Sequence, residues 1–218
     1  MNNWKNIWNN RKIDYSRYSQ IEDLLELDGF QGLNKPSLKQ WMNMVKSTSK
    51  LLDLNDKFKI LEIGCGADAF LYALHINNPQ SMLYGIDYSD PLLKIIRKVI
   101  PKGRFFSAEA KDFPKFNFKF DSIVSNSVIQ YFPDVNYLEL VIKHCFKYLK
   151  KEGTLLLIDI CDAKFQDESD IKRSENFKTS EHYKNKYENL PHLYIEKSMI
   201  EKILRRNNFK EIDYPDIS

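Results

Sequence analysis

The chain lacks several features that would each point to a particular class of protein. Only three cysteines occur in 218 residues, Cys65, Cys145 and Cys161, and they are scattered, with no Cys-x-x-Cys pair. An odd and dispersed set argues against a disulfide framework and against a zinc site built from clustered cysteines. We therefore expect reduced thiols, a cytoplasmic protein and no metal centre.

Long apolar runs and a strong net charge are also missing. No run approaches the ~18 apolar residues of a membrane-spanning helix, and the first twelve residues, MNNWKNIWNNRK, have no apolar core of a secretory signal. The formal net charge is +3, with lysines and acids interspersed. A balance this small does not indicate nucleic acid. A small-molecule partner is expected, with no nucleic acid and no membrane.

From Lys59 onward, short apolar runs alternate with amphipathic stretches. Six runs predict strands, at 60–64, 82–87, 104–108, 121–126, 154–160 and 209–214. Apolar residues at helical spacing predict helices over 90–100, 138–149 and 198–207, the first with Asp90 as N-cap and Pro91 in its first turn. Strands apolar on both faces, alternating with helices, predict a Rossmann-like, doubly wound and mostly parallel α/β sheet covered on both faces.

The ends of the chain differ from this central part. Residues 1–58 look helical and carry Trp4, Trp8 and Trp41. They are predicted to form an N-terminal extension packed over the ligand edge of the sheet, either as part of the site or as a cap with only a packing role. Residues 59–218 would form the main part of a single compact domain. The polar stretch 161–190 is long for a connection in such a domain, which favours a lid.

A glycine loop follows the first predicted strand. Gly64, Gly66 and Ala69 satisfy G-x-G-x-x-G/A, and Asp87 lies about 20 residues further on, a spacing that serves dinucleotides and S-adenosylmethionine alike. Glu62 beside the loop suits a cationic ligand better than a pyrophosphate. No Tyr-x-x-x-Lys of a short-chain dehydrogenase occurs, and Asn126 falls at the ligand edge of the fourth strand. These features favour S-adenosylmethionine, with a nicotinamide oxidoreductase as a remaining alternative.

The motifs across residues 59–160 resemble, in order and spacing, those of class I S-adenosylmethionine-dependent methyltransferases. The matching segments are EIGCG at 62–66, YGIDYS at 84–89, AEA at 108–110, FDSIV at 120–124, SNS at 125–127 and EGT at 152–154. Three further segments are similar to a bacterial small-molecule branch with type 11/25-like domains: LDGF at 27–30, QYF at 130–132 and LPHLY at 190–194.

The resemblance implies a role for each matching residue. Gly64, Cys65 and Gly66, with Glu62 beside them, would pass under the methionine moiety. Asp87 would hold the ribose hydroxyls, and Tyr88 would lie against the adenine. Glu109 would face the adenine 6-amino group with the Ala110 amide nearby, and Asn126 and Ser127 would border the methionine end and the methyl group. Cys65 is interpreted as a small packing residue of the loop rather than a nucleophile.

Two departures from the family pattern stand out. Family members usually have a third glycine where this chain has Asp68. An acid there could cap the next helix, yet repel the carboxylate of the cofactor, so Asp68→Gly is expected to tighten binding. The chain also ends soon after the sixth predicted strand, so we expect the sheet to lack the usual last antiparallel strand.

The predicted activity is methyl transfer to an oxygen or nitrogen atom of a small polar molecule, such as a metabolite, a glycan precursor or a natural product. Such an acceptor needs a base. Candidates in or after the fifth strand are His182, His192, Asp159 and Asp162; His192 is the first choice, with Tyr131 beside it as a second catalytic candidate. The Asn/Asp-Pro-Pro-aromatic and Pro-Cys motifs of nucleic-acid methyltransferases are absent. The alternative is a methyltransferase-like protein that is weak or inactive and acts as a binding partner or subunit.

Overall fold

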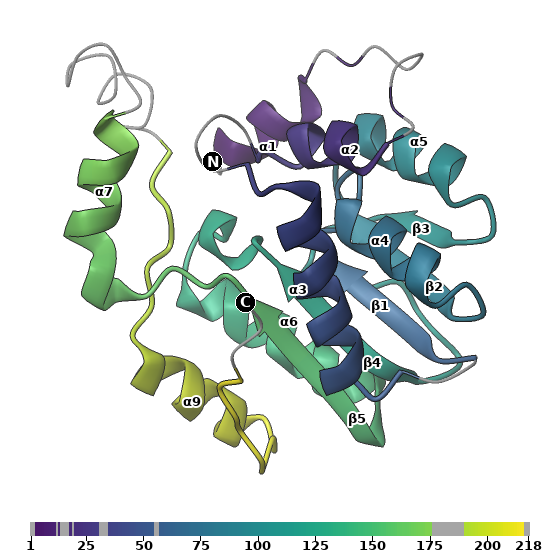
Figure 1. Ribbon diagram of the computed structural model, residues 1–218. Helices are drawn as coiled ribbons and strands as arrows, with labels where there is room; N and C mark the ends of the chain where they lie inside the picture. The colour runs from purple at the N-terminus through teal and green to yellow at the C-terminus, as the bar shows by residue number, and fades with distance from the viewer. Residues whose placement is uncertain are drawn as a thin grey trace.

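A sheet of five parallel strands forms the centre of the computed structural model, which describes residues 3–11, 13, 18, 20–30, 35–54, 57–175 and 190–215 (Figure 1). The strands are β1 Lys59–Ile63, β2 Met82–Asp87, β3 Arg104–Ser107, β4 Phe120–Asn126 and β5 Leu149–Ile158. They lie in the order β3-β2-β1-β4-β5. This order reverses direction between β1 and β4, where ligands of doubly wound sheets bind. The predicted fold class is confirmed.

Alternate residues of the central strands feed two hydrophobic cores, one on each face of the sheet. On β1, Ile60 belongs to one core, while Leu61 and Ile63 belong to the other. The first core is closed by α2 Ile21–Leu27, α3 Leu38–Leu51, α4 Ala69–Asn77 and α5 Asp90–Val99. The second is closed by α6 Val135–Tyr148 and α9 Lys197–Arg206. Each core contains one buried free cysteine, Cys65 in the first and Cys145 in the second.

Four further elements, α1, η2, η3 and α7, complete the described part. Helix α1 Asn3–Asn9 lies against α5, and α2 and α3 pack on α4. After β5 come the 3-10 helix η3 Ala163–Phe165 and helix α7 Gln166–Glu175, whereas η2 Ile129–Tyr131 follows β4. The middle of the predicted lid, 176–189, and with it His182, lies outside the described residues. None of the helices in the described ranges is long and apolar enough to cross a membrane.

The prediction of a sixth strand at 209–214 was wrong. Residues 209–215 are irregular, and within the described residues no strand follows β5. Phe209 donates its amide to the Leu204 carbonyl, which turns the chain back at the end of α9, and Tyr214 is held over α9 by Lys197 and Glu201. These contacts with α9 replace pairing with the sheet. The sheet has no antiparallel strand among the residues described.

Two predicted boundaries also need correction. Strand β5 begins at Leu149, five residues before the expected start, because it continues directly from the end of α6. The N-cap of α5 is Ser89 rather than Asp90, which is the first residue of the helix. Pro91 lies in the first turn, as predicted.

Candidate functional site

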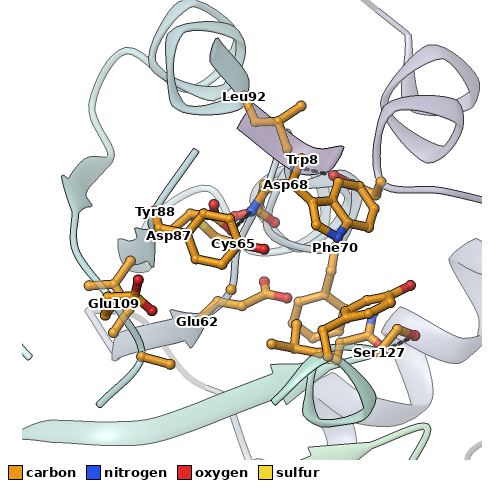
Figure 2. Close-up of a pocket in the computed structure, with 18 of the residues that line it drawn as sticks. Trp8, Glu62, Cys65, Asp68, Phe70, Asp87, Tyr88, Leu92, Glu109 and Ser127 are labelled. Carbon is orange, nitrogen blue, oxygen red and sulfur yellow. Dashed lines mark hydrogen bonds between the residues drawn. The ribbon is translucent and has the colours of Figure 1, made fainter. Parts of the chain in front are cut away.

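A cavity opens at the carboxyl ends of β1, β2 and β4 (Figure 2). It holds about 850 Å³ of space not filled by protein atoms, part of it open to solvent. All ten residues predicted to bind a cofactor line it, namely Glu62, Gly64, Cys65, Gly66, Asp87, Tyr88, Glu109, Ala110, Asn126 and Ser127. Tyr131 lines the cavity as well. His192 does not line it and lies behind Tyr131, with the centres of the two rings 5.5 Å apart.

The glycine loop after β1 has the backbone conformation that only glycine adopts readily. Gly64 and Gly66 have φ values of 70° and 53°. A Cβ on Gly64 would lie 2.6 Å from both methyl carbons of Val128. The loop is tied to the next strand, because the Gly64 and Cys65 amides donate to the Ile86 carbonyl at 2.8 and 3.1 Å. These two glycines therefore keep the floor of the cavity open.

Asp87, at the end of β2, faces the loop. Its carboxylate accepts hydrogen bonds from the Gly66 amide at 3.0 Å and the Ser89 amide at 2.7 Å. Burial raises the pKa of Asp87 to about 6, against the effect of these amides. The position agrees with the predicted ribose-binding role, which stays a prediction.

Asp28 is a site residue for which no role was predicted. It follows α2, and its carboxylate accepts hydrogen bonds from the amides of Ala67 at 2.8 Å, Ala69 at 2.9 Å and, more weakly, Asp68 at 3.4 Å. These are amides at the start of α4, which have no partner within the helix. Burial raises the pKa of Asp28 to about 7. Asp28 therefore fastens the N-terminal helices to the cofactor loop.

Glu62 and Asp68 form a buried carboxyl pair at the base of the cavity. Asp68 has φ 68° and caps α4, since its Oδ1 accepts the Leu71 amide at 2.5 Å. Its capping role is thus confirmed. The two carboxyl groups hydrogen-bond to each other, and no other side chain or amide of the described protein donates to Asp68 Oδ2 or Glu62 Oε2. Burial raises the pKa of both carboxyl groups well above the usual range; the neighbouring Asp68 raises the pKa of Glu62 further, whereas the hydrogen bond with Glu62 opposes the rise at Asp68.

The opposite wall contains Glu109, held from two sides. Tyr137 Oη donates to Glu109 Oε2 at 2.9 Å, and Lys5 of α1 forms an ion pair with Glu109 Oε1. The Lys5 ammonium also lies 5.6 Å from the centre of the Tyr88 ring. Neither Lys5 nor Tyr137 was singled out by the sequence, because their proximity to Glu109 depends on the tertiary fold.

Aromatic side chains of α1 cover the end of β4. Trp4 stacks on His192 with ring centres 4.9 Å apart and lies 4.8 Å from Tyr131, and Trp8 meets Tyr131 at 5.5 Å. Trp4 Nε1 donates to the Pro191 carbonyl at 3.0 Å, and Ser89 Oγ donates to the Trp8 carbonyl at 3.1 Å. The described part of the N-terminal extension therefore lies over the carboxyl edge of the sheet.

Two residues with left-handed backbone conformations, Ser127 and Asp159, lie just after the ends of β4 and β5. Ser127 and Asp159 have φ values of 55° and 56°, and Ser127 Oγ donates to Asp159 Oδ2 at 2.7 Å. This bond joins the ends of β4 and β5 beside Asn126. Polar groups are therefore available on the side of the cavity nearest Tyr131 and His192.

The cavity is lined by acidic side chains. Five carboxyl groups line it, from Asp28, Glu62, Asp68, Asp87 and Glu109, and its described lining contains no lysine, arginine or histidine. A glycine loop after β1 and an acid after β2, on a doubly wound sheet, define the class of nucleotide-cofactor-binding α/β proteins. An acidic lining favours a positively charged member of that cofactor class.

Comparisons with known proteins identify the family. A family model described as a methyltransferase domain matches residues 54–208, and the chain belongs to this family. The cofactor of the family is S-adenosylmethionine, as the motifs indicated. The resemblance drawn from the sequence is confirmed.

Curated relatives cover the same central region. A carboxy-S-adenosyl-L-methionine synthase of Campylobacter hominis is 31% identical over 60% of this chain and 57% of its own length. A malonyl-[acyl-carrier protein] O-methyltransferase of Priestia megaterium is 27% identical over 64% of this chain and 49% of its own. The chain thus spans about half the length of these relatives.

Solved structures share the fold. The plantazolicin methyltransferase BpumL, in complex with a triazolic desmethylPZN analog and SAH, has a TM-score of 0.61 at 20% identity, over 79% of this chain and 65% of that one. The YcgJ protein of Bacillus subtilis has a TM-score of 0.58 at 16% identity, over 75% and 67%. Both support the architecture described above.

The residues present fit S-adenosylmethionine. The glycine loop leaves room where a Cβ would collide with neighbouring atoms, and five acidic side chains line the cavity. A ligand with an ammonium and a sulfonium group would balance this acidic lining.

Proposed function

We propose that the protein transfers a methyl group from S-adenosylmethionine to an oxygen or nitrogen atom of a small polar molecule. The observation that carries this proposal is the placement of all ten predicted cofactor residues around one acid-lined cavity, with an aromatic wall of Trp4, Trp8 and Tyr131 beside it. When bound, the cofactor supplies an electrophilic methyl group on its sulfonium.

In this proposal different residues of the cavity bind different parts of the cofactor. Gly64 and Gly66 would allow the methionine portion to approach the backbone. Asp87 would accept hydrogen bonds from the ribose hydroxyl groups, and Tyr88 would pack on the adenine ring. Glu109 would accept a hydrogen bond from the adenine 6-amino group, with the Ala110 amide nearby. Asn126 and Ser127 border the methyl group, which places the acceptor near Tyr131.

The acceptor would enter between the end of β4 and the aromatic residues of α1. Alignment of acceptor and methyl group is the main catalytic contribution expected of such a site. His192 would take the proton of a hydroxyl or ammonium acceptor, and Tyr131 would orient the acceptor. Relatives named for methylation of malonyl-acyl carrier protein and of trans-aconitate support a small or carrier-bound molecule rather than nucleic acid.

The test is a product-detection assay with S-adenosylmethionine and a panel of small polar alcohols, amines and acids, using His192→Gln and, as a control, His75→Gln on the far end of α4. Turnover with one acceptor is expected, with kcat lowered about 10²–10⁴-fold in His192→Gln and SAH affinity unchanged. Equal turnover of both variants would remove His192 from the mechanism. SAH binding without turnover on any acceptor would favour the inactive, partner-type alternative.

A further inference from the structure

The start of helix α4 is occupied by a carboxylate that comes from another part of the chain. Asp28 Oδ1 accepts the Ala67 amide at 2.8 Å and, more weakly, the Asp68 amide at 3.4 Å, and Asp28 Oδ2 accepts the Ala69 amide at 2.9 Å. In doubly wound proteins that bind dinucleotides, the amides that follow the glycine loop bind the diphosphate instead. A carboxylate and a phosphate present the same kind of anionic acceptor oxygen to such amides. Asp28 therefore lies where the diphosphate of a dinucleotide would lie.

The second glycine of the loop makes room for this side chain. A Cβ on Gly66, which has φ 53°, would lie 2.6 Å from Asp28 Oδ1. In a dinucleotide site the second glycine is needed because the pyrophosphate approaches the backbone closely. In this chain the atom that approaches Gly66 belongs to the protein itself. The glycine pattern is thus retained, although the anion beside it is internal.

The turn that carries Asp28 is held firmly against α4. Asp28 ends α2 as its C-cap, and Gly29 follows in a left-handed conformation with φ 100°, a common way for a helix to end. The Phe30 amide closes the turn on the Leu25 carbonyl at 2.9 Å, and the Phe30 ring lies 5.2 Å from the ring of Trp41. The Trp41 indole in turn donates to the carbonyl of the first residue of α4 at 3.2 Å. Asp28 is therefore fixed at the start of α4.

The residues predicted to hold adenosine lie in the same cavity. Asp87, Tyr88 and Glu109 line it together with Asp28. An acid at the position of Asp87 serves the ribose of dinucleotides and of S-adenosylmethionine alike. The cavity thus keeps the nucleoside part of a dinucleotide site, whereas a side chain fills the diphosphate part.

We propose that Asp28 is a specificity-determining residue that fills the diphosphate position of the glycine loop and thereby excludes adenosine cofactors with a 5′-phosphate. A phosphate would find the amides of α4 already bonded and would meet a carboxylate in their place. S-adenosylmethionine carries a sulfonium and no phosphate at the 5′ carbon, so it is not excluded. The inference rests on the proposed function only in taking adenosine as part of the ligand.

The acidic lining offers a competing explanation for the exclusion of phosphate. Glu62 also lines the cavity and hydrogen-bonds to Asp68. If repulsion by the whole lining excluded phosphate, removal of the Glu62 charge would favour a phosphate-bearing ligand as much as removal of Asp28. If Asp28 fills the phosphate position, only substitution of Asp28 would do so, because only that change frees the amides of α4.

The experiment is calorimetric titration of the full chain with SAH, followed by displacement of SAH with adenosine and with ADP. The ratio of the Kd values for ADP and adenosine isolates the effect of the diphosphate. The titrations are made at pH 8, where Asp28 is ionised because its pKa is about 7. Wild type is compared with Asp28→Ala, with Asp28→Asn, which removes the charge but keeps a side chain of the same shape, and with Glu62→Gln as the matched control.

Wild type should bind ADP at least about tenfold more weakly than adenosine, since like charges face each other and the amides are occupied. Asp28→Ala should bind ADP about tenfold or more tightly than wild type does, because the freed amides donate to the phosphate, while its affinity for adenosine stays close to that of wild type. Asp28→Asn should gain less, and Glu62→Gln should keep the wild-type ratio. SAH binding shows that a variant is folded.

Three results would overturn the inference and leave the proposed function standing, because SAH binding is measured separately. They are equal binding of ADP and adenosine by wild type, a wild-type ratio in both folded Asp28 variants, and an equal gain for ADP in Glu62→Gln and Asp28→Ala. Were neither Asp28 variant folded, the ratio for wild type would decide. Failure of folded wild type to bind SAH and adenosine would overturn both the inference and the proposed function.

Discussion

The attachment of Asp28 to the start of α4 makes a sharp prediction about stability and pH. Asp28 is buried with its pKa raised to about 7, so the folded protein holds a proton on this group at pH values where the unfolded chain, with a pKa near 3.8, has released it. Stability contributed by that proton is full below about pH 4 and is lost as the pH rises towards 7. The free energy of unfolding should fall by up to about 1.4 kcal/mol per pH unit for this group.

Asp28→Asn keeps one oxygen as acceptor for the α4 amides and removes the titration. Between pH 5 and pH 7 its stability should therefore gain on wild type by up to about 2.7 kcal/mol. Urea unfolding at pH 5, 6, 7 and 8, followed by tryptophan fluorescence, measures the difference. Asp134→Asn is the control, because Asp134 also accepts an amide at the start of a helix, α6, but is exposed. Parallel pH profiles for wild type and Asp28→Asn would refute the reasoning.

Two further substitutions test the floor and the cover of the cavity. Gly64→Ala should abolish SAH binding and lower the free energy of unfolding by at least about 1 kcal/mol, since φ is 70° and the new Cβ would lie 2.6 Å from Val128; unchanged binding in calorimetry would contradict this. Lys5→Met removes a partly exposed ion pair, so the free energy of unfolding should change by less than about 1 kcal/mol. It also frees Glu109, and SAH should bind a few-fold tighter in titration; weaker binding would mean that Lys5 supports the site.

Much of the fold could be predicted from the sequence because its signals are local. The strands β1, β2 and β4 are buried on both faces, which leaves runs such as 60–63 almost wholly apolar. The sixth strand failed for a related reason. Residues 209–214 contain Phe209, Ile212 and Tyr214, but Phe209 and Ile212 pack against the second core instead of pairing with a strand. Apolar residues indicate that a segment is buried, but they do not indicate whether it packs on a helix or pairs with a strand.

The candidate site was likewise predictable only in part. Motif residues attached to strand ends, such as Glu62, Gly64 and Asp87, could be placed because the parallel sheet brings those ends together. Asp28 and Lys5 could not, since they belong to separate N-terminal segments and lie 39 and 104 residues away in the chain from their partners in the site. Asp28 did lie within the recognised LDGF segment, which was the one available signal.

The two cores separated by the sheet give the chain a pair of internal chemical reporters. Cys65 and Cys145 are the only cysteines in either core, both are buried, and burial raises the pKa of each thiol, which suppresses its reaction with alkylating reagents. Cys161, partly accessible between η3 and β5, serves as the reference that reacts in the folded state. Pulsed alkylation followed by peptide mass analysis would therefore time the opening of each face separately. Equal labelling rates at Cys65 and Cys145 would mark the whole sheet as a single cooperative unit, and unequal rates would reveal which face opens first.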